Sequence, residues 1–281
     1  MSSIIFAVLA VSVIGVVCAV MLSVVSKVMA IKTDPLVEAL RALLPGANCG
    51  ACGFAGCDGY AAALAAEEKT NLCTPGGPDV SRRISEELGV GFEAVTTRAA
   101  VMHCRGDCTV CQDKMEYAGI KSCAAAKIHF GGQSACVYGC IGYGDCVNAC
   151  PSRAIRIVNG IAKIDTSVCT GCGLCVKTCP NSIITTEEDS IHTVVGCSNR
   201  EKGAVVRKIC QRGCIACKKC ERECKAGAII VEGNLAGIDY SKCDSCGHCA
   251  EICPVRCIQQ ASFAGVFRKE EQEAADDAVP S

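Results

Sequence analysis

Cysteine carries the chemistry of this chain, because 28 of its 281 residues are cysteines. Such a density indicates disulfides, zinc sites or iron–sulfur clusters. Two runs, beginning at Cys169 and Cys243, read "CTGCGLCVKTCP" and "CDSCGHCAEICP". This Cys-x2-Cys-x2-Cys-x3-Cys-Pro spacing presents three thiolates to one [4Fe–4S] cluster, while the fourth cysteine ligates a partner cluster. Zinc also uses Cys-x2-Cys pairs, but several spaced runs that exchange ligands favour clusters.

An internal repeat doubles this arrangement. Residues 136–155 and 210–229 align over their whole length without a gap, and their cysteines fall at matching positions. Each segment is followed by a strand-like stretch and then by one of the two complete runs. The chain therefore contains two copies of a unit with two cysteine runs each. We expect each copy, over residues 136–190 and 197–260, to fold as a bacterial-ferredoxin-like 2[4Fe–4S] unit.

The exchange of fourth cysteines assigns most of the ligands of four clusters. The predicted sets are Cys169, Cys172, Cys175 with Cys150; Cys140, Cys146, Cys179 with one further ligand; Cys243, Cys246, Cys249 with Cys224; and Cys214, Cys217, Cys220 with Cys253.

Two residues depart from the expected pattern. Lys225 stands where a proline usually follows the fourth cysteine, and Tyr143 stands where the second cysteine of a triplet belongs. Tyrosine is a poor ligand for a low-potential cluster, so the sequence suggests Cys136, four residues before Cys140, as the replacement. The alternative is a site with three cysteines and a labile iron.

A different cysteine spacing lies nearer the N-terminus. The segment "NCGACGFAGCDGY", followed by "NLC", places cysteines at Cys49, Cys52, Cys57 and Cys73. Its glycines let the backbone wrap closely around a cluster. This module predicts a further [4Fe–4S] site, which brings the expected number to five.

The remaining cysteines leave the cluster number open at six or more. Four of them could complete a sixth cluster, or could simply be reduced thiols: Cys104, Cys108, Cys111 and Cys123. Cys197 and Cys210 could also approach a metal. Cys257 reads as a spare thiol, and Cys18 as an ordinary apolar residue.

The elements that position these cysteines begin with an apolar N-terminal segment. Residues 1–26 contain no charged side chain, and Lys27 and Lys32 follow. A helix of this length extends about 39 Å, which is enough to cross a bilayer core of about 30 Å. A cleaved signal peptide would need a basic start and a shorter core. We therefore expect a single-pass helix in the cytoplasmic membrane, with the N-terminus outside and the cluster domains in the reducing cytoplasm.

The predicted fold class is α+β. The expected parts are a transmembrane helix (1–26), a helical [4Fe–4S] module (34–95), a cysteine-bearing linker (96–135), two tandem ferredoxin-like units (136–190 and 197–260) and a disordered acidic tail (268–281). Within the module, residues 34–46, 60–69 and 78–89 read as helices.

Basic side chains crowd the second unit. Residues 198–225 contain nine Lys or Arg and three Glu, a net charge of +6. Such a patch can steer an acidic partner or raise the potential of a nearby cluster, and it can also be an ordinary solvated surface. No groove-reading or aromatic element accompanies it, so nucleic acid is not an expected partner.

The order of these motifs resembles that in the B subunit of the Rnf-type ion-translocating ferredoxin:NAD oxidoreductase complex. The most specific stretch is "GANCGACGFAGCDGYA" behind the apolar segment, and "GCIGYGDC" is similar to longer B subunits with two ferredoxin units. The likeness extends to about residue 260. It implies an electron relay between soluble ferredoxin and other membrane and peripheral subunits, coupled to Na⁺ or H⁺ pumping. Soluble ferredoxins tend to be acidic, so docking is expected at Lys218, Lys219, Arg222 and Lys225.

Two other functions fit the same cysteines. One is a membrane-tethered polyferredoxin that serves another reductase or a hydrogenase. The other is a redox sensor, although a sensor needs only one cluster. The sequence contains no nucleotide fingerprint or nucleophile constellation, so we expect no catalytic residue beyond the clusters.

Overall fold

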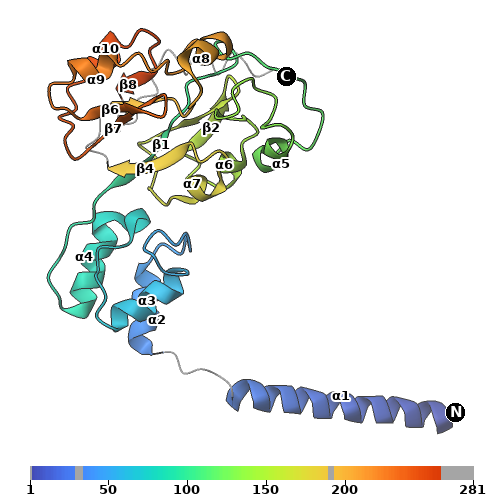
Figure 1. Cartoon of the computed structure of the whole chain (residues 1–281). Helices are drawn as coiled ribbons and strands as arrows, with labels where there is room; N and C mark the ends of the chain where they lie inside the picture. Colours follow the sequence, from blue (N-terminus) through green and yellow to red (C-terminus); the bar gives the residue numbers. More distant parts are fainter. Residues whose placement is uncertain (1, 29–33, 189–192, 261–281) are drawn as a thin grey trace.

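The computed structural model describes residues 2–28, 34–188 and 193–260. Figure 1 shows helix α1, a small helical module and a cysteine-rich body with two halves, in that order along the chain. Short helices and two-stranded ribbons make up the body. The expected acidic tail, residues 268–281, lies outside the described residues.

Helix α1 spans Ser2–Val28. Large apolar side chains along it are exposed, among them Phe6, Val17 and Leu22. Within the described part of the chain, no helix qualifies as a membrane span by its length and apolarity. The membrane anchor therefore stays a prediction.

The helical module contains α2 (Pro35–Leu43), α3 (Cys57–Ala65), η1 (Thr74–Gly76) and α4 (Gly77–Leu88). Its three α-helices confirm those expected from the sequence, with ends shifted by a few residues. The side chain of Asp34 caps α2 by accepting the N–H of Leu36, and Gly89 ends α4 in the left-handed conformation. Tyr60 and Ile84 lie in the apolar core that joins the helices.

The first ferredoxin-like unit holds two antiparallel ribbons, β1–β4 and β2–β3. Its elements are β1 (Arg98–Met102), α5 (Cys123–Ile128), α6 (Asp145–Asn148), β2 (Ile155–Val158), β3 (Ile161–Ile164), α7 (Leu174–Thr178) and β4 (Ile184–Glu188). Strand β1 comes from the segment 96–135, which the sequence suggested to be a linker. It pairs in register from Arg98 with Glu188 to Met102 with Ile184, so this segment contributes to the first unit.

The second unit repeats the design with ribbons β5–β8 and β6–β7. Its elements are β5 (Thr193–Val195), α8 (Gly203–Ile209), α9 (Lys219–Glu223), β6 (Ile229–Glu232), β7 (Leu235–Ile238), α10 (His248–Ile252) and β8 (Ile258–Gln260). Asn159-Gly160 turns the β2–β3 hairpin and Gly233-Asn234 turns β6–β7, with positive φ at all four residues. Two-residue turns of this kind match the twist of paired strands.

All four cysteine runs share one loop conformation. The residues two and four positions after the first cysteine have positive φ in every run: Gly142 and Gly144, Gly171 and Gly173, Ala216 and Lys218, Ser245 and Gly247. Three of these are not glycine and accept a conformation that L-residues rarely adopt. The run that contains Tyr143 keeps the same loop, so the missing cysteine does not change the backbone.

Candidate iron–sulfur sites

The first site lies in the helical module. Four cysteines line one cavity there: Cys49, Cys52, Cys57 and Cys73. Burial, with smaller contributions from the three neighbouring thiols, raises the pKa of Cys73 to about 11. The side chain of Asn48 accepts the N–H of Cys57 at 2.8 Å, which fixes the loop at the start of α3. The four thiols predicted from the sequence therefore meet around one cavity.

A second group forms in the first ferredoxin-like unit from a triplet and a distant fourth cysteine. Burial raises the pKa of Cys175 to about 12, with added contributions from the thiols of Cys169, Cys172 and Cys150. The N–H of Ala100 donates to Cys169 Sγ, and that of Ala154 to Cys150 Sγ, each at 3.3 Å. N–H···S bonds of this kind stabilise the thiolate form that binds iron.

The third group differs from the predicted set. One cavity is lined by Cys140, Cys146, Cys179 and Cys123. Burial is the main cause that raises the pKa of Cys146 to about 12, and the charges of Cys123 and Cys179 are the next largest causes. The sequence had suggested Cys136 as the fourth thiol here, and the structure places Cys123 in that position instead. Cys136 lines a different cavity, and that it ligates a cluster stays a prediction.

Helix α5 brings Cys123 to this cavity. Asp145 on α6 accepts hydrogen bonds from the Ser122 hydroxyl at 2.9 Å and from the N–H of Ala124 at 3.0 Å. These bonds hold the first turn of α5 against the cluster loop. Tyr143 instead donates its hydroxyl to Gln133 at 2.8 Å and packs against Tyr117. Thus a thiol from another element replaces the one that Tyr143 lacks.

A spacing in the sequence could have revealed Cys123. It lies 74 residues before Cys197, which is also the separation of Cys136 from Cys210 and of Cys140 from Cys214. Extending the repeat 13 positions upstream of Cys136 therefore pairs Cys123 with another unassigned cysteine.

The second unit assembles the two remaining predicted groups. Burial raises the pKa of Cys220 to about 11, and the nearby thiols of Cys214, Cys217 and Cys253 contribute. Burial likewise raises the pKa of Cys249 to about 11, next to the thiols of Cys243, Cys246 and Cys224. One cysteine of each group, Cys217 and Cys246, is exposed.

A fifth thiol adjoins the group that contains Cys214. Cys257 is 2% exposed, and its Sγ lies 3.6 Å from that of Cys253. Hydrogen bonds to Cys214 and Cys253 raise the pKa of Cys257, and they lower the pKa of Cys214 to about 6 and that of Cys253 to about 5. Cys257 therefore lies within hydrogen-bond reach of two predicted ligand sulfurs.

The other unassigned cysteines divide into two sets. Cys108 is exposed. Five more cysteines line one cavity: Cys104, Cys111, Cys136, Cys197 and Cys210. Within the described residues, no group of three or more His, Cys, Asp or Glu side chains is arranged to hold a single metal ion.

Comparisons with known proteins agree with this geometry. The family model described as "Putative Fe-S cluster" matches residues 44–75, a 4Fe-4S dicluster domain matches 135–183, and a 4Fe-4S binding domain matches 236–259. The B subunit of an ion-translocating oxidoreductase complex from Methanosarcina acetivorans is 40% identical over 85% of this chain and 92% of its own length. The B subunit of a proton-translocating ferredoxin:NAD(+) oxidoreductase complex from Clostridium ljungdahlii is 38% identical over 98% of this chain and 99% of its own.

The chain belongs to the B-subunit family of Rnf-type ion-translocating oxidoreductase complexes. A third relative, from Acetobacterium woodii, is 38% identical over 87% of this chain and 74% of its own length, and is named for Na(+) translocation.

In this B-subunit family member, the module site contacts the first ferredoxin-like unit. Lys177 on α7, two residues after Cys175, donates to the carbonyl oxygen of Cys49 at 3.3 Å. A Cβ added at Gly171 would lie 3.1 Å from the Thr74 side chain, so the residue after Cys73 packs beside the residue before Cys172. The cysteine loops of the two sites are therefore direct neighbours.

Proposed function

We propose that this chain is the electron-relay subunit of a membrane-bound, Na⁺- or H⁺-translocating ferredoxin:NAD oxidoreductase complex. Family membership supports this proposal, and the observation that carries it is the succession of cysteine groups. The module group adjoins the group of Cys175, which shares the first unit with the group of Cys146. The second unit adds two more groups. Five [4Fe–4S] clusters held in this succession form a conducting row.

The protein's own residues hold the clusters in place and tune their potentials. A [4Fe–4S] cluster accepts and gives up one electron at a time. Buried cysteines fix its position, and backbone N–H groups, such as that of Ala162 at 3.4 Å from Cys140 Sγ, stabilise the sulfur charge. Burial of Cys146 and Cys175 keeps water from the inner sites. Thus the chain conducts electrons, while the reactions of ferredoxin and NAD take place on its partners.

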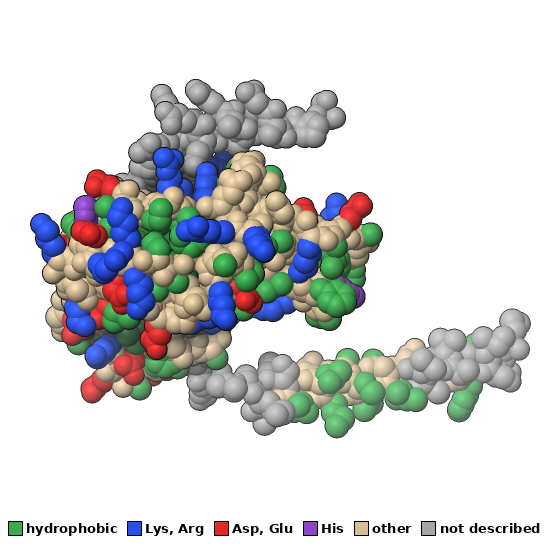
Figure 2. Space-filling view, turned by 45° about the horizontal axis from the view of Figure 1, so that its top comes forward, with side chains coloured by type: hydrophobic (Ala, Val, Ile, Leu, Met, Phe, Trp, Pro, Cys, Tyr) green, Lys and Arg blue, Asp and Glu red, His purple; other side chains and the backbone are tan. Residues whose placement is uncertain are grey.

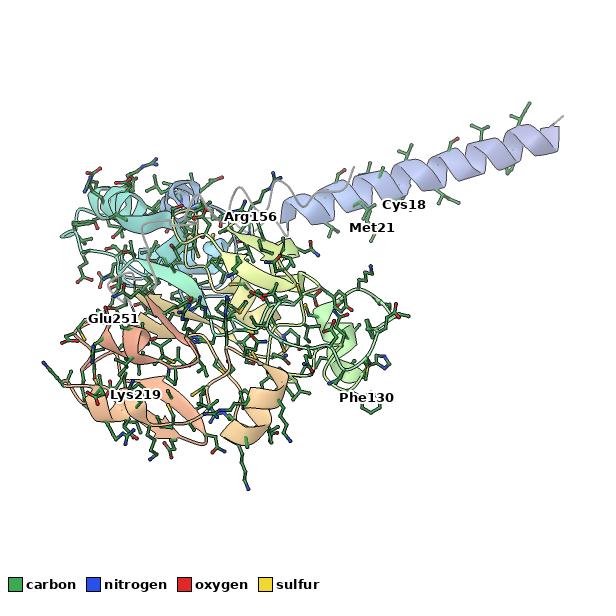
Figure 3. All side chains as sticks on the ribbon, turned by 90° about the horizontal axis from the view of Figure 1, so that it is seen from above. Cys18, Met21, Phe130, Arg156, Lys219 and Glu251 are labelled. Carbon is green, nitrogen blue, oxygen red and sulfur yellow. The ribbon has the colours of Figure 1, made fainter. Side chains whose placement is uncertain are left out.

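We place the contact with soluble ferredoxin at the second unit. Cys217 is exposed, and Lys218, Lys219, Arg222 and Lys225 beside it are exposed as well. Figure 3 labels Lys219 on α9, which packs against α10. Figure 2 shows Lys and Arg side chains spread over the visible face of the body, with acidic side chains between them. An acidic ferredoxin would be steered to this surface and would meet a cluster ligand there.

The membrane anchor belongs to the same proposal. Residues 1–26 are uncharged and Lys27 follows, which supports a single crossing of the cytoplasmic membrane with the cluster domains on the cytoplasmic side. A chain without residues 1–28 is then expected in the soluble fraction, whereas the full chain stays with the membranes after alkaline carbonate washing. Equal recovery of both chains from the soluble fraction would contradict the anchor.

One alternative is a membrane-tethered polyferredoxin for another reductase or a hydrogenase, because the same row of clusters would serve it. Purification of the tagged full chain from its native membrane separates the two. Flavin-bearing membrane subunits and ferredoxin-dependent reduction of NAD are expected in the purified complex. A hydrogenase or another reductase in their place would contradict the proposed function.

A further inference from the structure

Five cysteines meet in the cavity between the two ferredoxin-like units. Three of them come from the chain before or within the first unit, namely Cys104, Cys111 and Cys136, and two from the second unit, Cys197 and Cys210. Thiols line this cavity in the same way as they line two of the predicted cluster sites. Its lining therefore matches that of a cluster site.

We propose that this cavity holds a sixth [4Fe–4S] cluster, ligated by Cys104, Cys136, Cys197 and Cys210. This set differs from the group of Cys104, Cys108, Cys111 and Cys123 that the sequence suggested. Cys108 is exposed, and Cys123 lines the cavity of Cys140 and Cys146.

Backbone hydrogen bonds select four ligands from the five thiols. Each of the four accepts the N–H of the residue two positions later: Gly106 for Cys104, Tyr138 for Cys136, Asn199 for Cys197 and Arg212 for Cys210. The ferredoxin-type ligands Cys140, Cys214 and Cys243 show the same bond, to Gly142, Ala216 and Ser245. N–H···S bonds are a common means of stabilising cluster sulfurs.

Cys111 makes different contacts. Its sulfur lies 3.2 Å from the Ser134 hydroxyl, and it hydrogen-bonds to Cys210. The backbone N–H that its sulfur accepts is that of Cys136, not that of the residue two positions later. Cys111 therefore lacks the bond that the four proposed ligands share, and we leave it outside the ligand set.

Charge around the cavity suits an anionic cluster. Arg105 and Arg212 both line it. Arg212 also pairs with Asp107 at 3.5 Å, and Arg105 donates to the carbonyl oxygen of Arg256 at 3.1 Å, which ties the cavity wall to the second unit. The two guanidinium groups offset the negative charge of four thiolates.

The position of the site gives it a role, which rests on the proposed electron relay. The N–H of Cys140 donates to Cys104 Sγ at 3.4 Å, and the N–H of Cys214 donates to Cys197 Sγ at 3.3 Å. The proposed ligands thus contact a ligand of the first unit on one side and of the second unit on the other. A cluster held by these four thiols would supply one-electron redox chemistry at a point that contacts both units.

Iron and labile sulfide counts on the full-length, reconstituted protein test the site directly. Six clusters predict about 24 irons per chain and five predict about 20. We expect about 24 in the wild type, about four fewer in Cys197→Ala, and no loss in the matched variant Cys111→Ala from the same cavity. Integrated EPR intensity of the reduced protein should fall in parallel.

A wild-type count of about 20 would overturn the proposal, as would one zinc in place of the additional iron or an unchanged count in Cys197→Ala. If Cys197→Ala unfolds and loses nearly all its iron, the iron count of the wild type alone decides between five and six clusters. The result is independent of electron flow, because a chain with about 24 irons that ferredoxin cannot reduce would refute the relay and leave the site intact.

Discussion

The Sγ atoms of Cys253 and Cys257 lie 3.6 Å apart. Cys253 is the fourth cysteine of its run and Cys257 lies outside it, at the position that Ile183 takes in the first unit. A protonated thiol this close to a ligand sulfur is a hydrogen-bond donor, and donors to the sulfurs raise a cluster's potential. We therefore predict that Cys257 tunes the cluster expected at Cys214, Cys217, Cys220 and Cys253.

Replacing Cys257 with Ala should lower the midpoint potential of that cluster. Loss of one hydrogen bond of about 1 kcal/mol corresponds to a shift on the order of tens of mV for one electron. EPR-monitored redox titration measures the shift. The control is Cys257→Ser, which keeps a donor and should stay near the wild-type potential; a potential in the Ala variant equal to or above that of wild type would refute the tuning role.

Cys123 and Cys136 should belong to different clusters. Cys123→Ala is expected to lose the iron of the site formed by Cys140, Cys146 and Cys179. Cys136→Ala is expected to lose the iron of the cavity between the units. Because the two losses are independent, the double variant should lose about eight irons if each site empties. If both residues served one cluster, the double variant would lose no more than either single variant.

Charge reversal at Lys218 and Lys219 should slow reduction by ferredoxin. We expect a decrease on the order of tenfold at low ionic strength that shrinks as salt screens the interaction. Stopped-flow absorbance records the rate. The matched control reverses two exposed lysines far from the second unit's runs, Lys69 and Lys121. An equal decrease in the control would indicate a loss of overall charge attraction rather than docking at Lys218 and Lys219.

Without clusters, the protein should lose stability in alkaline solution. Burial raises the pKa of Cys146 and of Cys175 to about 12, whereas thiols in the unfolded chain titrate near about 8.5. Above that pH the unfolded chain releases these protons and the folded chain keeps them, so the free energy of unfolding falls as pH rises toward about 12.

Urea unfolding of the reduced, cluster-free chain at about pH 7 and about pH 10 checks this dependence. The cluster-loaded chain is the control, because its ligands are already deprotonated and should show a weaker dependence. A cluster-free chain that is equally stable at both values would contradict the argument.

The sequence predicted what is local and missed what depends on tertiary contacts. A run such as Cys169 to Cys179 carries its own loop, so spacing alone predicted that Cys150 would lie with Cys169, Cys172 and Cys175, as it does in the structure. Cys123 reaches its cavity through the bonds of Asp145 to α5, which no local motif encodes. The cavity of Cys104, Cys136, Cys197 and Cys210 likewise gathers residues up to 106 positions apart. Strand β1 was missed because its partner β4 is also distant in the sequence.

Anaerobic mixing of pre-reduced soluble ferredoxin with the oxidised, cluster-loaded full chain tests the central claim most directly. We predict that ferredoxin is oxidised while the visible absorbance of the chain's clusters bleaches by a matching number of electrons, fastest at low ionic strength. Absence of electron transfer at both low and high ionic strength would contradict it.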